Sequence, residues 1–319
     1  MFSNINADIQ TTSSDGQVSY LVPAAITDTG CERELNEDRY AVIESPSGIG
    51  WFVCDGMGGA SGGELAAQLA IDAIRRSLES SPCRNPEIAL REAISEANRV
   101  IVLRRQNQAF ANMGTTVLGV VIRGDELAIA HVGDSRAYLI RDDSIQQITH
   151  DHTLVQEMVD KGDLLQQDAL SHPQAHILTK CLGSEIALGL DPKTYWIWQT
   201  LSAQGQDFLL LCTDGLYSLV DEDEMANLVS SNTPQDACVQ LVELAKQRGG
   251  FDNITLAVLP IGGHIKERPQ IRESSSTQTG DVNSPSPWLE VLKIVAFMGI
   301  LSIVAILSVL FVVFYSIRF

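Results

Sequence analysis

Positive charge is scarce in this chain, and that scarcity excludes one large class of function. The 319 residues include 22 Lys and Arg against 40 Asp and Glu, which gives a formal net charge of -18. Such an acidic surface repels the phosphates of nucleic acids, so we expect no nucleic-acid partner. A phosphate group can still bind an acidic protein where metal ions or a single arginine reverse the local charge.

Two common sequence signatures are also absent. The six cysteines form no CxxC pair and no Cys/His cluster with zinc spacing, which is typical of a protein in a reducing compartment. The first residues, MFSNINADIQTTSSDGQ, have neither a basic start nor an apolar core, so they do not resemble a signal peptide.

Long apolar runs are confined to the C-terminus. Residues 294–315 read IVAFMGILSIVAILSVLFVVFY, a charge-free stretch long enough to cross a bilayer as one helix. The alternative is a buried core helix, but such a helix would show a broader polar face than Ser302 and Ser308 provide. We expect a single-pass tail anchor in the cell membrane (inner or plasma membrane), with the large domain in the cytoplasm. Basic residues lie on both sides of the span, so this orientation rests on its position near the chain end.

Composition divides the chain into four parts. We expect a flexible N-terminus over 1–20, a globular domain over 21–261, a flexible linker over 262–287 and the membrane anchor over 288–319. The linker is rich in Ser, Thr, Gly and Pro and poor in apolar residues, which is typical of a flexible tether.

Within the globular part, hydrophobic patterns predict both strands and helices. The predicted strands are 40–45, 50–55, 116–122, 126–133, 136–141, 207–214 and 253–260. Helices are predicted over 64–78, after Asn85-Pro86 and after Thr233-Pro234. Because the strands do not alternate regularly with helices, and hairpin turns separate several of them, we predict an α+β fold with antiparallel sheets and helices outside.

Acidic residues recur after apolar runs or glycines in this part of the chain. Asp55 stands in VCDGMGG, Asp134 in HVGDSRA, Asp214 in CTDGLY and Asp252 in GGFDNIT, and a further acidic cluster is RELNEDRY. A single Asp-Gly is most often only a turn. Four such aspartates together favour a shared site, and carboxylates without Cys or His suit hard divalent cations such as Mg²⁺ or Mn²⁺.

These motifs resemble the metal-dependent type 2C (PPM) serine/threonine protein phosphatases in their bacterial form. The matching segments, in chain order, are 33–38, 55–64, 114–116, 131–138, 151–159, 177–183, 210–217 and 251–255. The resemblance covers about residues 21–261 and implies a central β-sandwich flanked by helices in α-β-β-α layers. It also implies a metal centre at one end, and a flap over about 151–183 that helps to choose substrates.

The resemblance implies a set of metal ligands. Asp55 would bridge two Mn²⁺ or Mg²⁺ ions, and the carbonyl of Gly56 would bind the second ion. Asp214 and Asp252 would hold the first ion. Asp134, together with Asp214, matches the positions for a third ion in bacterial members.

Three further residues match catalytic positions of the family. Arg33 matches the phosphate-binding arginine, Glu37 would act through a metal-bound water, and Asp38 would support the site. In this reading, a water shared by two metals loses a proton near neutral pH and attacks phosphorus in line. The histidine that eukaryotic relatives place after the first Asp-Gly is replaced here by Met57, and the second common position is Ala60, so no residue is assigned as general acid.

The sequence therefore predicts a membrane-tethered phosphatase that acts on phosphoserine and phosphothreonine in proteins. We expect a monomer that counteracts a Ser/Thr protein kinase. A binding module that senses phosphoproteins without turnover would lack metal ligands, whereas all of them are present here. A metal-dependent phosphodiesterase or nuclease is disfavoured because the chain is acidic and has no basic groove.

Overall fold

The computed structural model describes residues 9–12, 18–58, 62–142, 144–184, 188–190, 192–198 and 207–267. All of them lie in the first of two units into which the chain divides, residues 1–268. The predicted membrane span, and all but the first residues of the predicted linker, lie outside the described residues. None of the helices within the described ranges combines the length and apolar character that a bilayer crossing requires.

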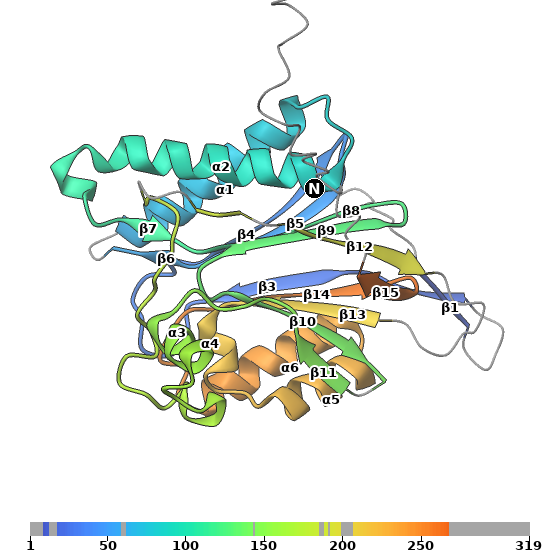
Figure 1. The fold of residues 1–319 in the computed structure, drawn as a ribbon. Coiled ribbons are helices and arrows are strands. Elements are labelled where there is room, and N and C mark those ends of the chain that lie inside the picture. The colour runs from blue at the N-terminus through green and yellow to red at the C-terminus, as the bar shows by residue number, and fades with distance from the viewer. Residues whose placement is uncertain are drawn as a thin grey trace, which may run out of the picture. The chain divides into compact units, whose positions relative to one another are not determined.

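Two antiparallel sheets form the centre of this unit (Figure 1). The five-stranded sheet has the order β11 (Ser144–Gln147), β10 (Arg136–Arg141), β13 (Asp207–Cys212), β14 (Ile254–Ile261) and β3 (Ala24–Asp28). The six-stranded sheet has the order β15 (His264–Glu267), β12 (Lys193–Trp198), β9 (Glu126–Val132), β8 (Val117–Arg123), β5 (Gly48–Cys54) and β4 (Arg39–Ser45). Two short pairs lie outside these sheets, β1 (Ile9–Thr12) with β2 (Val18–Leu21) and β6 (Gly56–Met57) with β7 (Gly114–Thr115).

Helices cover the outer face of each sheet, as Figure 1 shows. The six-stranded sheet is covered by α1 (Gly62–Ser80) and α2 (Pro86–Arg105). The five-stranded sheet is covered by α5 (Glu222–Ser231) and α6 (Pro234–Gln247). The shorter helices are α3 (Leu154–Lys161), α4 (Asp214–Tyr217) and the 3-10 turns Gln108–Phe110 and Gln166–Asp168. The predicted α-β-β-α layering is therefore confirmed.

Strand periodicity explains how the sequence fills both faces of each sheet. Leu209 and Leu211 of β13 pack between the two sheets, in one cluster with Leu118 of β8. The intervening Leu210 and Cys212 face the opposite way and pack with the helices α5 and α6. Because successive side chains of a strand point to opposite faces and both faces are covered, β13 is apolar from Phe208 to Cys212. Burying each such leucine contributes about 1.5–3 kcal/mol.

The seven predicted strands are all confirmed, with ends shifted by a few residues. The helix start at Asn85-Pro86 is also confirmed, since Asn85 Oδ1 accepts a hydrogen bond from the Ile88 N–H at 2.9 Å. One detail was wrong: the strand predicted over 207–214 ends at Cys212, and Asp214-Gly215 begins α4 instead of forming a turn. The strand β3 and the helix α5 were not predicted.

Candidate metal centre

Asp55 lies between β5 and β6, and its backbone is held on both sides. Its N–H donates to Thr116 Oγ1 at 2.9 Å, and its carbonyl accepts from Thr115 Oγ1 and from the Thr116 N–H, both at 2.8 Å. The next residue must be glycine, because a Cβ on Gly56 would lie 2.1 Å from the carbonyl oxygen of Gly63 at the start of α1. The Asp-Gly pair therefore lets β6 approach α1 while fixing the Asp55 carboxylate at the end of the six-stranded sheet.

The second Asp-Gly pair is built in the same way on the other sheet. Asp214 is the first residue of α4, directly beyond β13, and Asp252 lies just before the neighbouring strand β14. A Cβ on Gly215 would lie 2.0 Å from the Asn253 carbonyl oxygen, so the glycine lets the two loops approach closely. Asp214 Oδ1 is buried and has no hydrogen-bond partner among the described residues.

Two more carboxylates are buried beside these. Asp38 Oδ2 accepts from the hydroxyl of Thr213 at 2.9 Å, which places it next to Asp214. Asp134 follows β9 through Gly133, whose φ of +106 is a conformation that favours glycine. Both side chains belong to residues that are almost fully buried.

The carboxylates act on one another electrostatically. Burial raises the pKa of Asp38 and of Asp134 to about 7 each, and repulsion from Asp214 adds to both shifts. Burial and then repulsion from the other four raise the pKa of Asp55 well above its usual range. The pKa of Asp252 is raised by burial and by Asp214, and Arg33 partly offsets this. These five aspartates therefore form one cluster, which we call the acidic cluster.

Arg33 and Glu37 lie at the edge of the acidic cluster, on the loop before β4. Arg33 is about half exposed, and its Nη2 donates to Asp252 Oδ2 at 2.8 Å. The Glu37 N–H donates to Asn253 Oδ1 at 2.8 Å, and a Cβ on Gly63 would lie 2.6 Å from Glu37 Oε1. The structure thus brings all eight predicted site residues to the same end of the sandwich.

The chemistry of the acidic cluster fits a divalent cation. In the described ranges, no group of three or more His, Cys, Asp or Glu side chains has the geometry needed to hold a metal ion. Arg33 contacts one of the carboxylates, and His176 Nδ1 lies 3.6 Å from Asp214 Oδ2. The donors are nevertheless all oxygens, their charges repel, and Asp214 Oδ1 is without a partner in this part of the chain. Such a set suits Mg²⁺ or Mn²⁺.

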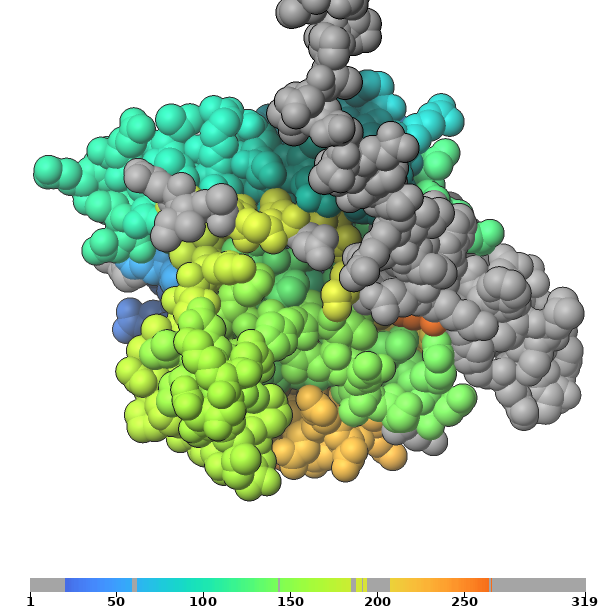
Figure 2. Space-filling view, viewed as in Figure 1, coloured from blue at the N-terminus to red at the C-terminus, as the bar shows by residue number. Residues whose placement is uncertain are grey.

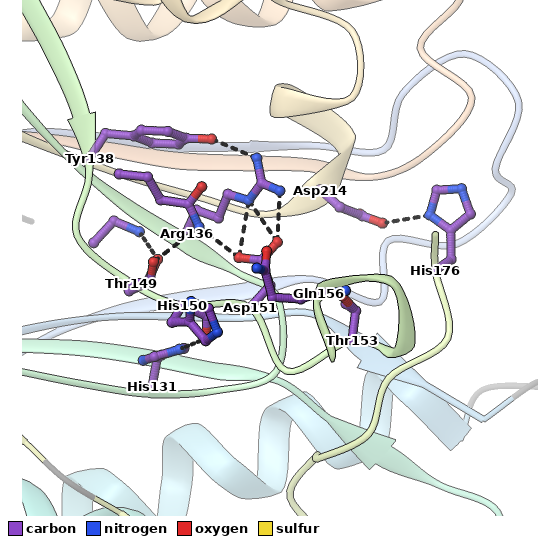
Figure 3. Close-up of polar contacts among 12 residues, drawn as sticks. His131, Arg136, Tyr138, Thr149, His150, Asp151, Thr153, Gln156, His176 and Asp214 are labelled. Carbon is purple, nitrogen blue, oxygen red and sulfur yellow. Dashed lines mark hydrogen bonds and ion pairs between the residues drawn. The ribbon is translucent and has the colours of Figure 1, made fainter. Parts of the chain in front are cut away.

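His176 is a site residue that the sequence analysis missed. Figure 3 shows its ring directed at Asp214 from the flap. A pocket of about 380 Å³ is lined by Arg33, His176, Asp214, Gly215, Ser218, Phe251 and Asp252. No motif spacing pointed to His176, because its position depends on the path of a loop that carries little regular structure.

Two other histidines, His131 and His152, pack against each other. The rings of His131 and His152 stack, with centroids 4.8 Å apart and planes 4° apart. His131 Nε2 donates to the His150 carbonyl at 2.7 Å, and the Gly133 N–H donates to His152 Nδ1 at 3.1 Å. Burial lowers the pKa of His131 and lowers that of His152 to about 3, so both rings are neutral at pH 7.

Comparison with known proteins gives a consistent answer. The family described as Protein phosphatase 2C matches residues 32–243. A serine/threonine phosphatase stp from Listeria welshimeri is 35% identical over 240 residues, which span 73% of this chain and 93% of the relative. The solved structure of the Mycobacterium tuberculosis phosphatase PstP/Ppp is 32% identical with a TM-score of 0.67 and covers 76% of this chain and 99% of that one. The catalytic domain of a PstP, 30% identical with a TM-score of 0.65 over 75% of this chain and 97% of its own, was solved with two manganese ions.

Proposed function

Because this chain belongs to the protein phosphatase 2C family and is a protein serine/threonine phosphatase, we propose that it releases phosphate from phosphoserine and phosphothreonine with divalent ions held by the acidic cluster. Asp55, the Gly56 carbonyl, Asp214 and Asp252 would hold two Mn²⁺ or Mg²⁺ ions, and Asp134 would contribute to a third. Bound there, such ions supply the positive charge that acidifies a water and neutralises phosphoryl oxygens.

The side chains around the acidic cluster have separate tasks in this proposal. Arg33 is exposed enough to turn from Asp252 to a phosphate, and its planar fork can grip two phosphate oxygens at once. Asp38 is held by the Thr213 hydroxyl and adds negative charge beneath Asp214. Glu37 lies over the Gly56–Gly63 contact, where it can accept hydrogen bonds from water.

One observation carries the proposal: burial and neighbouring carboxylates raise the pKa of Asp38, Asp55, Asp134 and Asp252, and Asp214 Oδ1 beside them is buried without a partner among the described residues. Buried charge of one sign is costly unless something of the opposite sign meets it. Arg33 meets only the outer edge of the cluster. A bound cation would neutralise the repelling carboxylates and so offset the free-energy cost of holding them together.

The test follows phosphate release by the full-length chain from a phosphothreonine peptide with EDTA, Mg²⁺ or Mn²⁺. We expect activity only with metal, and none from Asp214→Ala. Asp125→Asn, which changes an exposed aspartate in the β8–β9 turn, is the matched control and should keep full activity. If metal binds but no phosphopeptide is hydrolysed, the protein is instead a phosphoprotein-binding module.

We also propose that residues 294–315 tether the enzyme to the cell membrane as a tail anchor, with the catalytic domain in the cytoplasm as a monomer. The support is the apolar, charge-free sequence of this span. A Ser/Thr kinase in the same membrane and its targets would be the natural substrates, since tethering raises local concentration. Full-length protein should sediment with membranes, and Ile303→Asp with Leu307→Asp should release it. Sedimentation unchanged by these substitutions would refute the anchor.

A further inference from the structure

Arg136 is a buried cation that binds side chains from three separate segments. Its Nη2 and Nε donate to Asp151 Oδ2 at 2.7 and 2.9 Å, and its Nη1 donates to the Tyr138 hydroxyl at 3.0 Å (Figure 3). Its Cζ lies 3.8 Å from the centre of the Tyr217 ring. The side chains of Arg136 and Asp151 are only 8% and 5% exposed, so solvent cannot replace these contacts.

Each partner of Arg136 belongs to an element of the active end. Arg136 itself begins β10, two residues after Asp134. Tyr217 is the last residue of α4, whose first residue is Asp214. Asp151 opens the flap, residues 151–183, which forms much of the yellow-green surface in Figure 2. The Arg136 guanidinium thus connects three parts of the active end. These are the strand β10 that follows Asp134, the helix α4 that begins with Asp214, and the base of the flap.

Hydrogen bonds within the flap connect Asp151 at its base to the segment that carries His176. Residues 152–154 pair with residues 177–179: the Thr179 N–H donates to the His152 carbonyl, and the Leu154 N–H to the Ile177 carbonyl, both at 2.8 Å. His176 directly precedes this paired segment and faces Asp214. The contacts therefore run in a closed circuit from Arg136 through Asp151 and the flap to His176, and from Arg136 through Tyr217 and α4 to Asp214.

We propose that Arg136 is a positioning residue, which sets the flap and its His176 against the helix that carries Asp214. The inference rests on the proposed function, since it concerns how a phosphopeptide meets that site. Arg136 and Asp151 neutralise each other, so the pair contributes alignment and little net charge. Only a planar guanidinium can grip a carboxylate through two N–H groups while its face lies on an aromatic ring.

The test compares two Arg→Lys substitutions on the same strand in the full-length protein. Arg136→Lys keeps the charge but loses the fork and the ring contact. Arg141→Lys is the matched control, because Arg141 also grips a buried aspartate, Asp207, at the other end of β10, where its Nε donates at 2.7 Å. Both variants lose a two-pronged grip on a buried aspartate, but only Arg136→Lys also loses a contact with an aromatic ring, and only Arg136 lies beside the flap.

For Arg136→Lys we expect kcat/KM for a phosphothreonine peptide to fall by about 10- to 100-fold, as slight misplacement of binding groups can cause. Hydrolysis of p-nitrophenyl phosphate, which is too small to need the flap, should change less than about threefold on the same reasoning. Arg141→Lys should change neither substrate's hydrolysis. Equal losses on both substrates, or equal effects of the two variants, would mean that Arg136 only stabilises the fold.

Two further measurements do not depend on comparing the peptide with p-nitrophenyl phosphate. Trypsin should cut the exposed Lys161 and Lys180 of the flap faster in Arg136→Lys than in Arg141→Lys, because the flap base is loosened. In a His176→Ala background, Arg136→Lys should cost much less on the peptide, since coupled residues are not additive. Unchanged cleavage together with additive losses would overturn the proposal. A wild-type chain without phosphatase activity would count against the proposed function, while the cleavage result would still judge Arg136.

Discussion

The strand β13 has a buried aspartate at its start and another just beyond its end, and the fold treats them in opposite ways. Asp207, at the start, is completely buried and accepts hydrogen bonds from Arg141 Nε and from the Ile265 N–H, both at 2.7 Å. Asp214, beyond the end, has one buried oxygen without a partner in the described structure and four carboxylate neighbours. The same side chain is neutralised by an arginine of the chain in one place, whereas in the other the proposed function would have it meet a bound cation.

The largest expected difference between the two ends is in catalysis. Asp214→Asn keeps the shape of the side chain but removes the charge that a cation would meet, so we expect kcat to fall by about 1000-fold or more, as losses of electrostatic stabilisation in active sites can reach. Asp207→Asn should keep nearly wild-type activity per folded molecule. Phosphate release with saturating Mn²⁺ measures both, and comparable losses in the two variants would remove the distinction between the ends.

Stability should change with opposite sign at the two ends. Asp207→Asn leaves Arg141 without its ion pair and should destabilise the protein by about 3 kcal/mol. Asp134→Asn removes one of several repelling charges, so in EDTA at pH 8 it should stabilise the protein by about 1 kcal/mol. Urea unfolding of both variants gives these values. Destabilisation by Asp134→Asn in EDTA would show that its carboxylate is already satisfied within the fold.

Arg33 offers a smaller contrast with Arg141. Its ion pair with Asp252 is exposed, so Arg33→Lys should change the free energy of unfolding by less than about 1 kcal/mol. Loss of the two-pronged grip should nevertheless raise KM for a phosphopeptide by about tenfold, the effect of losing one good charge-assisted hydrogen bond. Steady-state kinetics beside a thermal melt test this. An unchanged KM would mean that the guanidinium stays on Asp252 during turnover.

Much of the site could be predicted because its residues sit in short motifs tied to local geometry. Asp55 and Asp214 each precede a glycine that the packing requires, since a Cβ on Gly56 or Gly215 would overlap backbone oxygen. Such pairs reveal themselves as an apolar run followed by Asp-Gly. The continuous apolar run of β13 likewise predicted a strand, and that strand lies in the centre of its sheet.

Residues whose position depends on long-range contacts could not be predicted in this way. His176 reaches Asp214 only because residues 177–179 pair with residues 152–154, and neither segment shows a strand pattern. Arg136 was visible as part of HVGDSRA, but its partner Asp151 lies in another segment and Tyr217 in a third. The helical state of Asp214-Gly215 was missed because four residues are too few to show helical periodicity.

The pH dependence of stability should expose the acidic cluster without any mutation. In the metal-free folded protein, burial raises the pKa of Asp38 and of Asp134 from 3.8 to about 7. The folded state therefore holds protons that the unfolded state has lost, and this stabilisation, complete below pH 3.8, disappears as the pH rises through about 7. In EDTA, the free energy of unfolding should fall by about 1 kcal/mol per pH unit around pH 7.

Saturating Mn²⁺ should reverse this slope, because metal and protons compete for the same carboxylates and the metal wins as the pH rises. Thermal melts between pH 6.5 and 8.5, in EDTA and in Mn²⁺, measure both slopes. Because the contact with Asp214 raises the pKa of His176, the same melts on His176→Ala separate the contribution of this histidine from that of the carboxylates. Asp38→Asn with Asp134→Asn should flatten the EDTA slope, whereas Arg141→Lys, at the neutralised end of the sheet, should leave it unchanged. If the slope in EDTA were flat in the wild-type protein, the carboxylates would already be charged and compensated, and the difference between the two ends of β13 would be one of position alone.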